Sequence, residues 1–438
     1  MLDINLIRTN PDHVAGQLKK RGFSVDFSKL LKLDEEKRKC QKSYEEARAK
    51  RNSVSSEIAK LKQQGQDKLA NEKIVAMQKL GNQIAKADKK ITKYETEIFD
   101  ILSGIPNIPA LDVVSGGKEA NKVIKTFGKK PDFDFTPKDH IELCTQLGLI
   151  DYERGVRMSG SGAWVYTGMG ARLEWALLNY FVDFHVANNY KFIMPPHLLN
   201  YESGYAAGQF PKFEEDVFFT NFDKDKKKTK FLLPTSETAL INMHRSETIP
   251  AENLPIKYAA YSPCYRAEAG GYGANERGMI RGHQFNKIEM FIFAQEHESA
   301  ELFNELLNNA EKLIEGLGLH YQTVALAAGD VGAAMAKTCD TEVYIPSMKG
   351  YKEVSSVSNA MCYQARRANI KAKTVLHECG EGACRKIVHN DFVHTLNASG
   401  LATSRLIPAI VEQFQNPDGS VNVPEVLQKY LGGAKRLG

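Results

Sequence analysis

The sequence contains no apolar run that approaches the roughly 18 residues a helix needs to cross a bilayer. Its first residues, MLDINLIRTNPDHV, include early acidic side chains and no apolar segment typical of a signal peptide. Neither GxGxxG nor GxxxxGK followed by Ser or Thr occurs. These absences argue against a membrane protein, a secreted protein and a Rossmann or P-loop nucleotide site. We therefore expect a soluble, cytoplasmic protein without a membrane partner.

Cysteine is sparse, and its seven residues are irregularly spaced, which argues against a disulfide framework. They are Cys40, Cys144, Cys264, Cys339, Cys362, Cys379 and Cys384. The segment HECGEGACRKIVH could be a metal site with His377, Cys379, Cys384 and His389 as ligands. Its spacing contains no CxxC pair and matches no usual zinc pattern. We expect reduced thiols and loop histidines there, and a metal site remains the alternative.

The length of 438 residues predicts two domains, and 42% hydrophobic residues allow a sizeable core. The net charge of +5 is mild but unevenly distributed. Between Lys32 and Glu95 there are 17 Lys and Arg against 10 Asp and Glu, so the basic excess belongs to this one segment.

Two stretches of the basic segment repeat apolar residues at alternating steps of three and four, the pattern of a coiled-coil seam. The first contains Cys40, Tyr44, Ala47, Val54, Ile58 and Leu61, with Arg51 at its charged position. The second contains Met77, Leu80, Ile84, Ala87, Ile91, Tyr94 and Ile98. Because only the short polar break QQGQDK separates them, we predict two antiparallel helices that form an arm from about residue 30 to 102. Its Lys- and Arg-rich outer face is either simply solvated or binds a long polyanion through phosphate contacts.

The Gly- and Pro-containing stretch SGIPNIPALDVVSGG ends the arm, and we place the domain boundary near residue 110, which gives domains 1–110 and 111–438. Strands and helices then alternate without a regular βαβ rhythm. We predict helices at 173–188 and 299–317, the second with Ser299 as N-cap. KFIMPP predicts a strand that ends at its prolines, and KFLLPTSETALINMH predicts strand, turn and helix. FDKDKKKTK is interpreted as a solvated hairpin tip.

Residues 262–291, SPCYRAEAGGYGANERGMIRGHQFNKIEMF, contain two predicted strands at 262–266 and 284–291. Alternation would place Arg266 and Glu268 on one face of the first strand, and Phe285, Lys287 and Glu289 on one face of the second. If the strands pair, this shared face suits a ligand with a phosphate, a flat base and an ammonium group. The alternative is a salt-bridge ladder across a hairpin, which explains the charges but neither the aromatic ring nor the glycine-rich loop.

CYRAEAG…RGMIRGHQFNKIEMF resembles the second signature motif of class II aminoacyl-tRNA synthetases in its seryl-tRNA synthetase form. Four further segments resemble motifs of this family in the same order: FIMPPHLL the first motif at the dimer interface, LLPTSETAL the TSE loop, YKEVSSVSNAMCYQARR the acidic strand with its serine pair, and HTLNASGLATSRLIPAIVE the third motif. The basic hairpin resembles the family's N-terminal arm. The resemblance covers about residues 1–430. It implies an α+β fold in which a helical coiled-coil arm precedes a catalytic domain built on an antiparallel sheet flanked by helices.

The resemblance also implies roles for individual residues. Arg266 would hold the α-phosphate of ATP, Glu268 the adenine side, and Arg281 the terminal phosphate, while Phe285 and Arg405 would stack on the adenine. Further nucleotide contacts would come from Ala267, Val354 and Ser355, and Mg²⁺ would bind Glu353 and Ser356. The serine pocket would consist of Thr235, Ser236, Glu237, Glu289, Asn397 and Ser399. The catalytic residues would be Arg266, Glu268, Arg281 and Arg405.

The implied activity is a two-step ligation, in which L-serine is activated by Mg·ATP to seryl-adenylate and then transferred to the 3′-terminal ribose of tRNA(Ser). The arm would bind the long variable arm of the tRNA, with tRNA(Sec) left open as a second partner, and the chain would form a homodimer. Two alternatives remain: an amino-acid ligase that does not use tRNA, and a non-catalytic tRNA-binding paralogue. Three departures from the family pattern stand out. Ser404 replaces the usual glycine before Arg405, the segment 367–392 is longer than expected and is interpreted as a loop insertion, and the loop GGYGANERG leaves its tRNA contacts unassigned.

Overall fold

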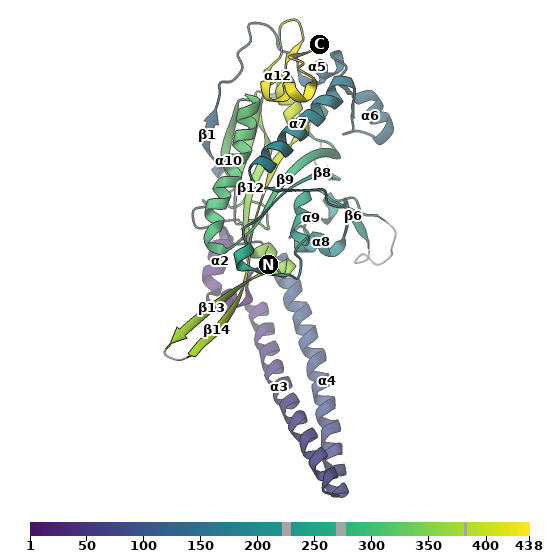
Figure 1. Ribbon diagram of the computed structural model, residues 1–438, viewed down its shortest axis with the longest axis vertical. Helices are drawn as coiled ribbons and strands as arrows, with labels where there is room; N and C mark the ends of the chain where they lie inside the picture. The colour runs from purple at the N-terminus through teal and green to yellow at the C-terminus, as the bar shows by residue number, and fades with distance from the viewer. Residues whose placement is uncertain (221–228, 269–276, 381–382) are drawn as a thin grey trace. The chain divides into compact units, whose positions relative to one another are not determined.

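The computed structural model describes residues 1–220, 229–268, 277–380 and 383–438, and the side chains of 377–386 lie outside this description. The chain divides into two compact units. One comprises 2–16 and 24–105, and the other comprises Met1, 17–23 and 106–438 (Figure 1). The predicted hairpin tip at 222–230, the loop at 269–276 and the His/Cys cluster fall wholly or mostly outside the described residues. Within the described helices, none is both long enough and apolar enough to cross a bilayer.

The first unit is helical and confirms the predicted arm. Helices α1 (Ile4–Thr9) and α2 (Pro11–Lys19) precede α3 (Ser28–Gln63) and α4 (Asp67–Gly104). The last two pack along their length as an antiparallel hairpin (Figure 1). Lys37 pairs with Glu95 at 2.9 Å near the open end, and Glu57 pairs with Lys73 near the turn. Every residue of the predicted seam is buried or half-buried, Arg51 included, while most residues between them are exposed. Burial of this single stripe therefore holds the two helices together.

An eight-stranded sheet forms the centre of the second unit. Its strands, in spatial order, are β1 (Lys122–Phe127), β10 (Tyr321–Ala325), β11 (Lys337–Ile345), β12 (Gly350–Met361), β15 (His394–Ala402), β9 (Gln284–Ala294), β8 (Ile256–Tyr265) and β4 (Lys191–Ile193). All neighbours are antiparallel except β4 and β8, which are parallel. Smaller pairs are β2 (Ile150–Asp151) with β3 (Val165–Tyr166), β5 (Leu198–Asn200) with β6 (Lys230–Leu232), and β16 (Val421–Asn422) with β17 (Arg436–Leu437).

Helices cover the two faces of this sheet unequally. On one face lie α7 (Gly168–Ala187), α10 (Ser299–Leu317) and α12 (Thr403–Gln413), which share the main core with Ile288, Met290 and other inward residues. On the other face, α8 (Tyr201–Ala206), α9 (Ser236–Asn242) and α11 (Tyr363–Ala368) cover the part of β9 that carries Phe291 and Phe293. The odd-numbered residues at the start of β9, from Phe285 to Glu289, lie beyond the apolar cluster beneath these helices. This stretch of the sheet face carries the candidate site.

Short helices complete the unit: α5 (His140–Gln146), α6 (Tyr152–Ser159), α13 (Glu425–Gln428) and the 3₁₀ turn η5 (Gly278–Ile280). The predicted strand in KFIMPP is confirmed by β4, and the predicted strand, turn and helix are confirmed by β6 and α9. Ser299 is not the N-cap of α10. The cap position is Glu298, and the Ser299 hydroxyl donates to the carbonyl of Glu296 at 3.1 Å, because a preceding 3₁₀ turn leads directly into the helix.

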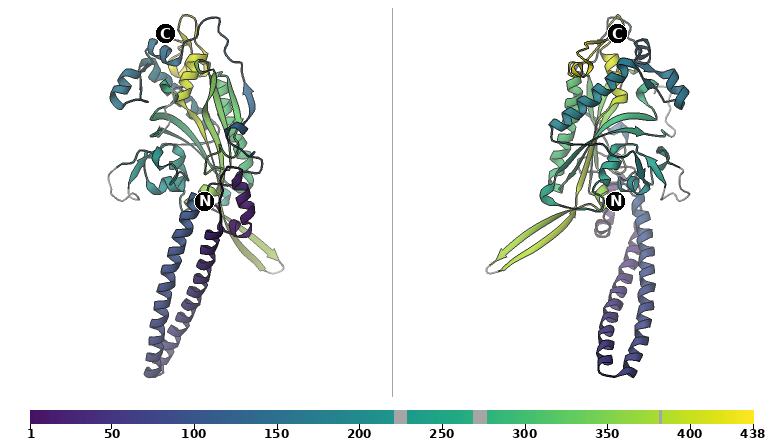
Figure 2. Two further views of the ribbon diagram at one scale, coloured as in Figure 1. Left: turned by 180° about the vertical axis from the view of Figure 1, so that it is seen from behind. Right: turned by 45° about the vertical axis from the view of Figure 1, so that its right-hand side comes forward.

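Two other expectations are corrected. The segment expected to be a loop insertion forms a β-hairpin, β13 (Lys371–Gly380) and β14 (Ala383–Phe392), which extends away from the main sheet (Figure 2). β13 also pairs with the parallel strand β7 (Thr248–Pro250), so the hairpin is a continuation of a small sheet. The expectation that Arg266 and Glu268 alternate along one strand is wrong. β8 ends at Tyr265, before both residues, and Glu268 has a left-handed φ of 51°.

Candidate active site

Strands β8 and β9 bring the first predicted residues together. They pair antiparallel, with Ser262 opposite Lys287 and Cys264 opposite Phe285, so even residues of β8 and odd residues of β9 share a face. Arg266 follows β8 on this face. Its guanidinium carbon lies 5.1 Å from the centroid of the Phe285 ring, and its Nε donates to the Pro234 carbonyl at 3.3 Å. The predicted pairing of the two strands and their shared polar face are confirmed.

Glu268 and Arg281 meet across the loop between the two strands. Arg281 Nε donates to Glu268 Oε2 at 2.6 Å, and its Nη2 lies 2.5 Å from the same oxygen. The positive φ of Glu268 turns its side chain toward Arg281 instead of along the strand. Ala267 is held by a hydrogen bond from its amide to the Asp216 carbonyl at 2.9 Å. The two residues predicted to bind opposite ends of a nucleotide are therefore bonded to each other.

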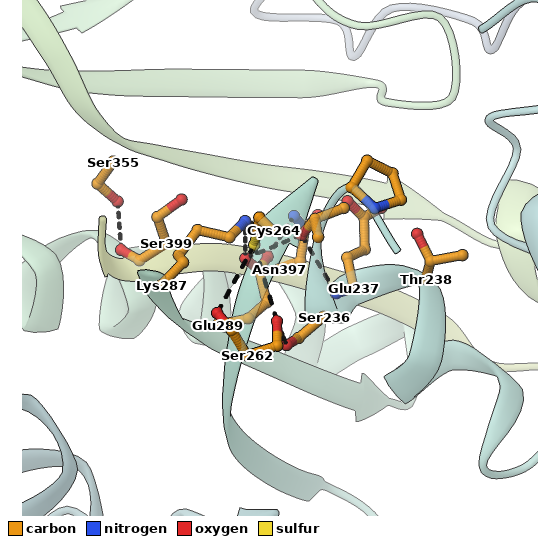
Figure 3. A network of polar contacts seen from close by, with 12 residues as sticks. Ser236, Glu237, Thr238, Ser262, Cys264, Lys287, Glu289, Ser355, Asn397 and Ser399 are labelled. Carbon is orange, nitrogen blue, oxygen red and sulfur yellow. Dashed lines mark hydrogen bonds and ion pairs between the residues drawn. The ribbon is translucent and has the colours of Figure 1, made fainter. Parts of the chain in front are cut away.

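Glu289 is the centre of a buried polar network (Figure 3). It forms an ion pair with Lys287, and the Lys287 Nζ also donates to Thr235 Oγ1 at 2.7 Å. Thr235 Oγ1 contacts Glu289 Oε2 at 3.3 Å, and Asn397 Nδ2 donates to the other carboxylate oxygen at 3.1 Å. Glu289 is 1% exposed and Lys287 5%. Since an unpaired buried charge costs several kcal/mol, each of the two side chains compensates the cost of burying the other.

Glu237 brings a second carboxylate to the same network. It lies in the first turn of α9, where Thr235 is the N-cap, and Gln364 Nε2 donates to Glu237 Oε1 at 2.6 Å. Burial raises the pKa of Glu237 to about 7, and repulsion from the Glu289 carboxylate adds to the increase. Ser236, between these two site residues, is fully buried and shares a hydrogen bond of 2.6 Å with the Ser262 hydroxyl. Its side chain therefore fixes α9 to the sheet.

Arg405 lies in the first turn of α12. Its Nε donates to the Ile280 carbonyl at 3.1 Å and its Nη1 to the Glu353 carbonyl at 2.7 Å, with the Glu353 carboxylate 3.8 Å away. Ser404 has an ordinary helical backbone and is 8% exposed, so its Cβ is accommodated where the family pattern has glycine. The departure in the third motif thus leaves Arg405 directed at the site.

Oxygen ligands for a cation gather beside Glu353. The register partners Glu342–Glu353 and Asp340–Ser356 place these four side chains on one face of β11 and β12. The Ser356 hydroxyl bonds the Asp340 carboxyl, whose other oxygen, Oδ1, is buried without a hydrogen-bond partner in the described structure. Burial, and next the Glu353 charge, raise the pKa of Asp340 well above its usual range. Among the described residues no group of three or more Asp, Glu, His or Cys side chains could hold a metal ion by itself, so Glu353 and Ser356 fit Mg²⁺ only as one or two oxygen ligands that phosphate oxygens would complete.

Val354 and Ser355 form a bulge between those two positions, and their side chains point to the main core. Ser355 Oγ donates to the carbonyl of Ser399 at 2.6 Å, which ties β12 to β15 next to Glu289 (Figure 3). Contacts of Val354 and Ser355 with a nucleotide would therefore come from their backbones. Ser399 is half-buried opposite Glu289.

Two adjacent cavities contain most of these residues. A cavity of about 400 Å³ is lined by Thr235, Glu237 and the segment 332–335, and one of about 70 Å³ is lined by Phe285, Glu353 and Arg405. Three residues line both cavities: Arg266, Glu268 and Arg281. Of the predicted serine-pocket residues, Thr235 and Glu237 line the larger cavity and Ser399 lines the smaller one, so the three shared residues connect the two groups.

Sequence reasoning assigned no role to three residues of this region: Lys287, Gln364 and Asp340. Alternation predicted that Lys287 shares a face with Glu289, but not that it pairs with Glu289 and donates to Thr235. Gln364 and Asp340 carry no local signal. Gln364 reaches Glu237 from a helix 127 residues away in sequence.

Comparison with known proteins agrees with both units. The family model for the tRNA synthetase class II core domain (G, H, P, S and T) matches residues 218–414, and the model for the seryl-tRNA synthetase N-terminal domain matches residues 1–109. Serine–tRNA ligase 2 of Clostridium acetobutylicum is 50% identical over 99% of this chain and 100% of its own length, and the serine–tRNA ligase of Pelotomaculum thermopropionicum is 43% identical over the full length of both. The crystal structure of the Pyrococcus horikoshii seryl-tRNA synthetase complexed with ATP superposes with a TM-score of 0.86 at 31% identity, covering 100% of this chain and 99% of that one.

The fold and the arrangement of the three motifs are those of a class II tRNA synthetase core. Because the similarity to seryl enzymes extends through the N-terminal arm at up to 50% identity, the chain belongs to the seryl-tRNA synthetase family. The predicted fold class is confirmed.

Proposed function

We propose that this protein is a serine–tRNA ligase that activates L-serine with ATP and transfers the seryl group to the 3′-terminal ribose of tRNA(Ser). The observation that carries the proposal is the buried network of Thr235, Lys287, Glu289 and Asn397 beside the Arg266–Phe285 pair. This arrangement supports an amino-acid pocket next to a phosphate and base site. The names of the relatives and the ATP complex of the Pyrococcus enzyme support the same activity.

In the first step, a serine carboxylate oxygen attacks the α-phosphorus of ATP, and the bond from that phosphorus to pyrophosphate breaks. Arg266 would bind the α-phosphate, where negative charge develops, and Arg281 the departing phosphates. Phe285 and Arg405 would hold the adenine between them. The serine carboxylate is already deprotonated at neutral pH, so we assign no general base. The rate acceleration would come from positioning of the reactants and stabilisation of the developing charge.

Glu353 and Ser356, with Asp340 behind them, would hold Mg²⁺. When bound, Mg²⁺ supplies charge neutralisation for phosphate oxygens. The protein's own contribution on this side is to keep Glu353 in place, since its carbonyl accepts a hydrogen bond from Arg405. A loss of Arg405 would therefore affect both the adenine contact and the position of Glu353.

The serine pocket holds two buried carboxylates, Glu237 and Glu289, against one lysine. The Arg266 charge also faces Glu237, but it would be taken up by the α-phosphate of ATP. With both carboxylates ionised, the pocket then lacks one positive charge, which the ammonium group of serine would supply. Thr235, Asn397 and Ser399 would bind the hydroxyl and the remaining polar atoms, so that alanine would leave them unpaired. Threonine would be excluded by size.

The remaining partners are also proposals. The basic outer face of α3 and α4 would bind the tRNA through its backbone and shape, and tRNA(Sec) is a further candidate. A homodimer is supported by large apolar residues exposed on α7 and in the segment FIMPPHLL that resembles the first motif: Trp175 at 57% and Val186 at 51% on α7, Phe192 at 37% on β4, and Met194 at 71% just after it. The domain boundary near residue 110 and the cytoplasmic location stay predictions.

Serine-dependent ATP–pyrophosphate exchange, followed by charging of purified tRNA pools with each amino acid, tests the proposal. Exchange with serine only, and charging of tRNA(Ser) with serine, are expected; charging of tRNA(Sec) as well would add the further candidate. Exchange without charging would favour the tRNA-independent ligase, and no exchange with any amino acid would favour the non-catalytic paralogue.

A further inference from the structure

Six consecutive carbonyl oxygens, from Val331 to Ala336, accept hydrogen bonds from residues that are distant in sequence. The segment VGAAMA connects β10 to β11 and belongs to no helix or strand. No helix or strand hydrogen bonds hold it, and Gly332 adds conformational freedom. Its path is therefore set by the donors that bind its carbonyls.

Arg21 supplies three of these bonds. Its Nη2 donates to the carbonyls of Val331 and Gly332, the latter at 2.7 Å, and its Nη1 donates to that of Met335 at 3.0 Å. Nη1 also donates to the carbonyl of Asn107 at 2.7 Å. Burial lowers the pKa of Arg21 to about 10. Four neutral carbonyls fix the guanidinium. Binding all four requires its planar fork of N–H donors, which lysine does not have.

Asn107 and Ala110 supply the other three. The Asn107 amide donates to the carbonyl of Ala333 at 2.8 Å, and its Nδ2 donates to that of Ala334 at 3.0 Å. The amide of Ala110 donates to the carbonyl of Ala336 at 2.8 Å. Asn107 Nδ2 also bonds the carbonyl of Ala360 on β12 at 2.9 Å, which connects the segment to the main sheet. Asn107 is 6% exposed, so these bonds are shielded from water.

The opposite surface of this segment lines the larger cavity of the site. Gly332, Ala333, Ala334 and Met335 face Thr235 and Glu237 across it. Ala334 also packs closely against Gly208, another residue of the cavity wall: a Cβ added at Gly208 would lie 2.9 Å from the Ala334 Cβ. A shift of the segment would therefore change the width of the cavity at Thr235 and Glu237, two residues proposed to bind serine, while Phe285 and Arg405 line the other cavity.

We propose that Arg21 and Asn107 are positioning residues that set the size of the amino-acid pocket, and thereby the discrimination of serine against threonine, by fixing the wall at 331–336. The inference rests on the proposed function and names residues outside the family motifs. Both residues precede the class II core match, which begins at 218.

The test is the ratio of kcat/KM for serine to kcat/KM for threonine in ATP–pyrophosphate exchange without tRNA. This ratio does not depend on the fraction of active enzyme, so a mere loss of folded protein leaves it unchanged. Arg21→Met and Asn107→Ala should each lower it about tenfold, because exclusion of one methyl group is worth roughly that factor or more. The KM for ATP should change less than about twofold, and Arg21→Lys should resemble Arg21→Met.

Arg8→Met is the matched control, since Arg8 binds Asp34 through Nε at 2.8 Å and Nη2 at 2.9 Å and touches no wall residue. It should keep the wild-type ratio. If the ratio stays within about twofold of wild type in Arg21→Lys and Asn107→Ala, the inference is wrong, whether or not Arg21→Met folds. Absence of serine-dependent exchange in the wild-type protein would instead overturn the proposed function.

Discussion

Lys287 and Glu289 form an ion pair two residues apart on one strand, and both side chains are almost fully buried. Breaking one side of such a pair leaves an uncompensated charge, which typically destabilises a protein by about 3–5 kcal/mol. The pair therefore contributes to stability as well as to the proposed serine pocket. These two contributions can be separated by substitution.

Glu289→Gln should reduce serine-dependent exchange by at least about a hundredfold, because a charged contact to the substrate ammonium is lost. ATP binding, measured by calorimetry, should stay within about twofold of wild type. The reason is that Glu289 does not line the cavity that contains Phe285 and Arg405. Lys287→Met combined with Glu289→Gln is the control: it should recover melting temperature but not activity. Loss of ATP binding with serine binding retained would contradict the assignment of Glu289.

The raised pKa of Glu237 leads us to expect that serine binding depends on pH. Its pKa is raised to about 7 by burial and then by Glu289, and the Lys287 and Arg266 charges and the Gln364 amide that also face it do not cancel this increase. Below pH 7 the empty pocket therefore holds a neutral Glu237, and a serine ammonium must displace its proton. The KM for serine in the exchange reaction should rise as the pH falls from 8 to 6, by up to about tenfold per pH unit at the low end.

The KM for ATP serves as the internal control for that titration, since Glu237 lies on the serine side of the site. Serine binding at pH 6.5 should also release protons, which calorimetry in buffers of different ionisation enthalpy detects. A KM for serine that is constant between pH 6 and 8 would show that Glu237 is already ionised in the empty pocket.

The raised pKa of Glu174 leads us to expect that the stability of the protein depends on pH. It is buried on α7, where Asn286 and Thr403 donate to its Oε1 at 2.7 and 2.6 Å, and burial raises its pKa from 4.5 to about 7. A raised carboxyl pKa contributes stability that is fully present below about pH 4.5 and is lost as the pH rises through 7. The shift corresponds to about 3 kcal/mol.

The melting temperature of the wild-type protein should decline between pH 5 and 8, and this decline should be smaller in Glu174→Gln. At pH 8 the variant should be at least as stable as the wild-type protein. Glu142→Gln, at an exposed position of α5, is the control and should leave the decline unchanged. The assignment of Glu174 is refuted by equal declines in wild type and Glu174→Gln.

The arm and the paired strands could be predicted from the sequence because their signals are local. A seam repeats every three or four residues, and strands β8 and β9 follow each other closely along the chain. Glu268 was misplaced because alternation was extended past Tyr265, where the chain turns into the left-handed region. The hairpin at 371–392 was missed although its β-branched residues favour strands.

What could not be predicted depends on the tertiary fold. Gln364 contacts Glu237, and Arg21 contacts Met335, across 127 and 314 residues of sequence. No spacing rule connects such positions, since their proximity results from how the sheet is assembled. The motifs therefore predict which residues face a ligand, but not which residues support them.

The exposed basic residues of the arm predict a division of labour. Lys89 and Lys90 lie on the outer face of α4, and neither belongs to the seam. Changing both to Gln should raise the KM for tRNA(Ser) several-fold and lower the slope of log K against log salt by about two, because each phosphate contact contributes roughly one unit. Arg51 is unsuitable for this purpose, since it is half-buried in the seam.

Lys118→Gln with Lys129→Gln makes the same change in net charge at exposed positions of the other unit and is the matched control. It should alter the KM for tRNA(Ser) less than the arm variant does. Serine-dependent exchange should be equal to wild type in both variants, because that reaction needs no tRNA. If the arm variant lost exchange while its KM for tRNA(Ser) stayed constant, the arm would contribute to the first step. If both variants weakened tRNA binding equally, the effect would come from overall charge instead of a surface on α3 and α4, since long-range attraction depends on net charge and is screened within about 10 Å at 0.1 M salt.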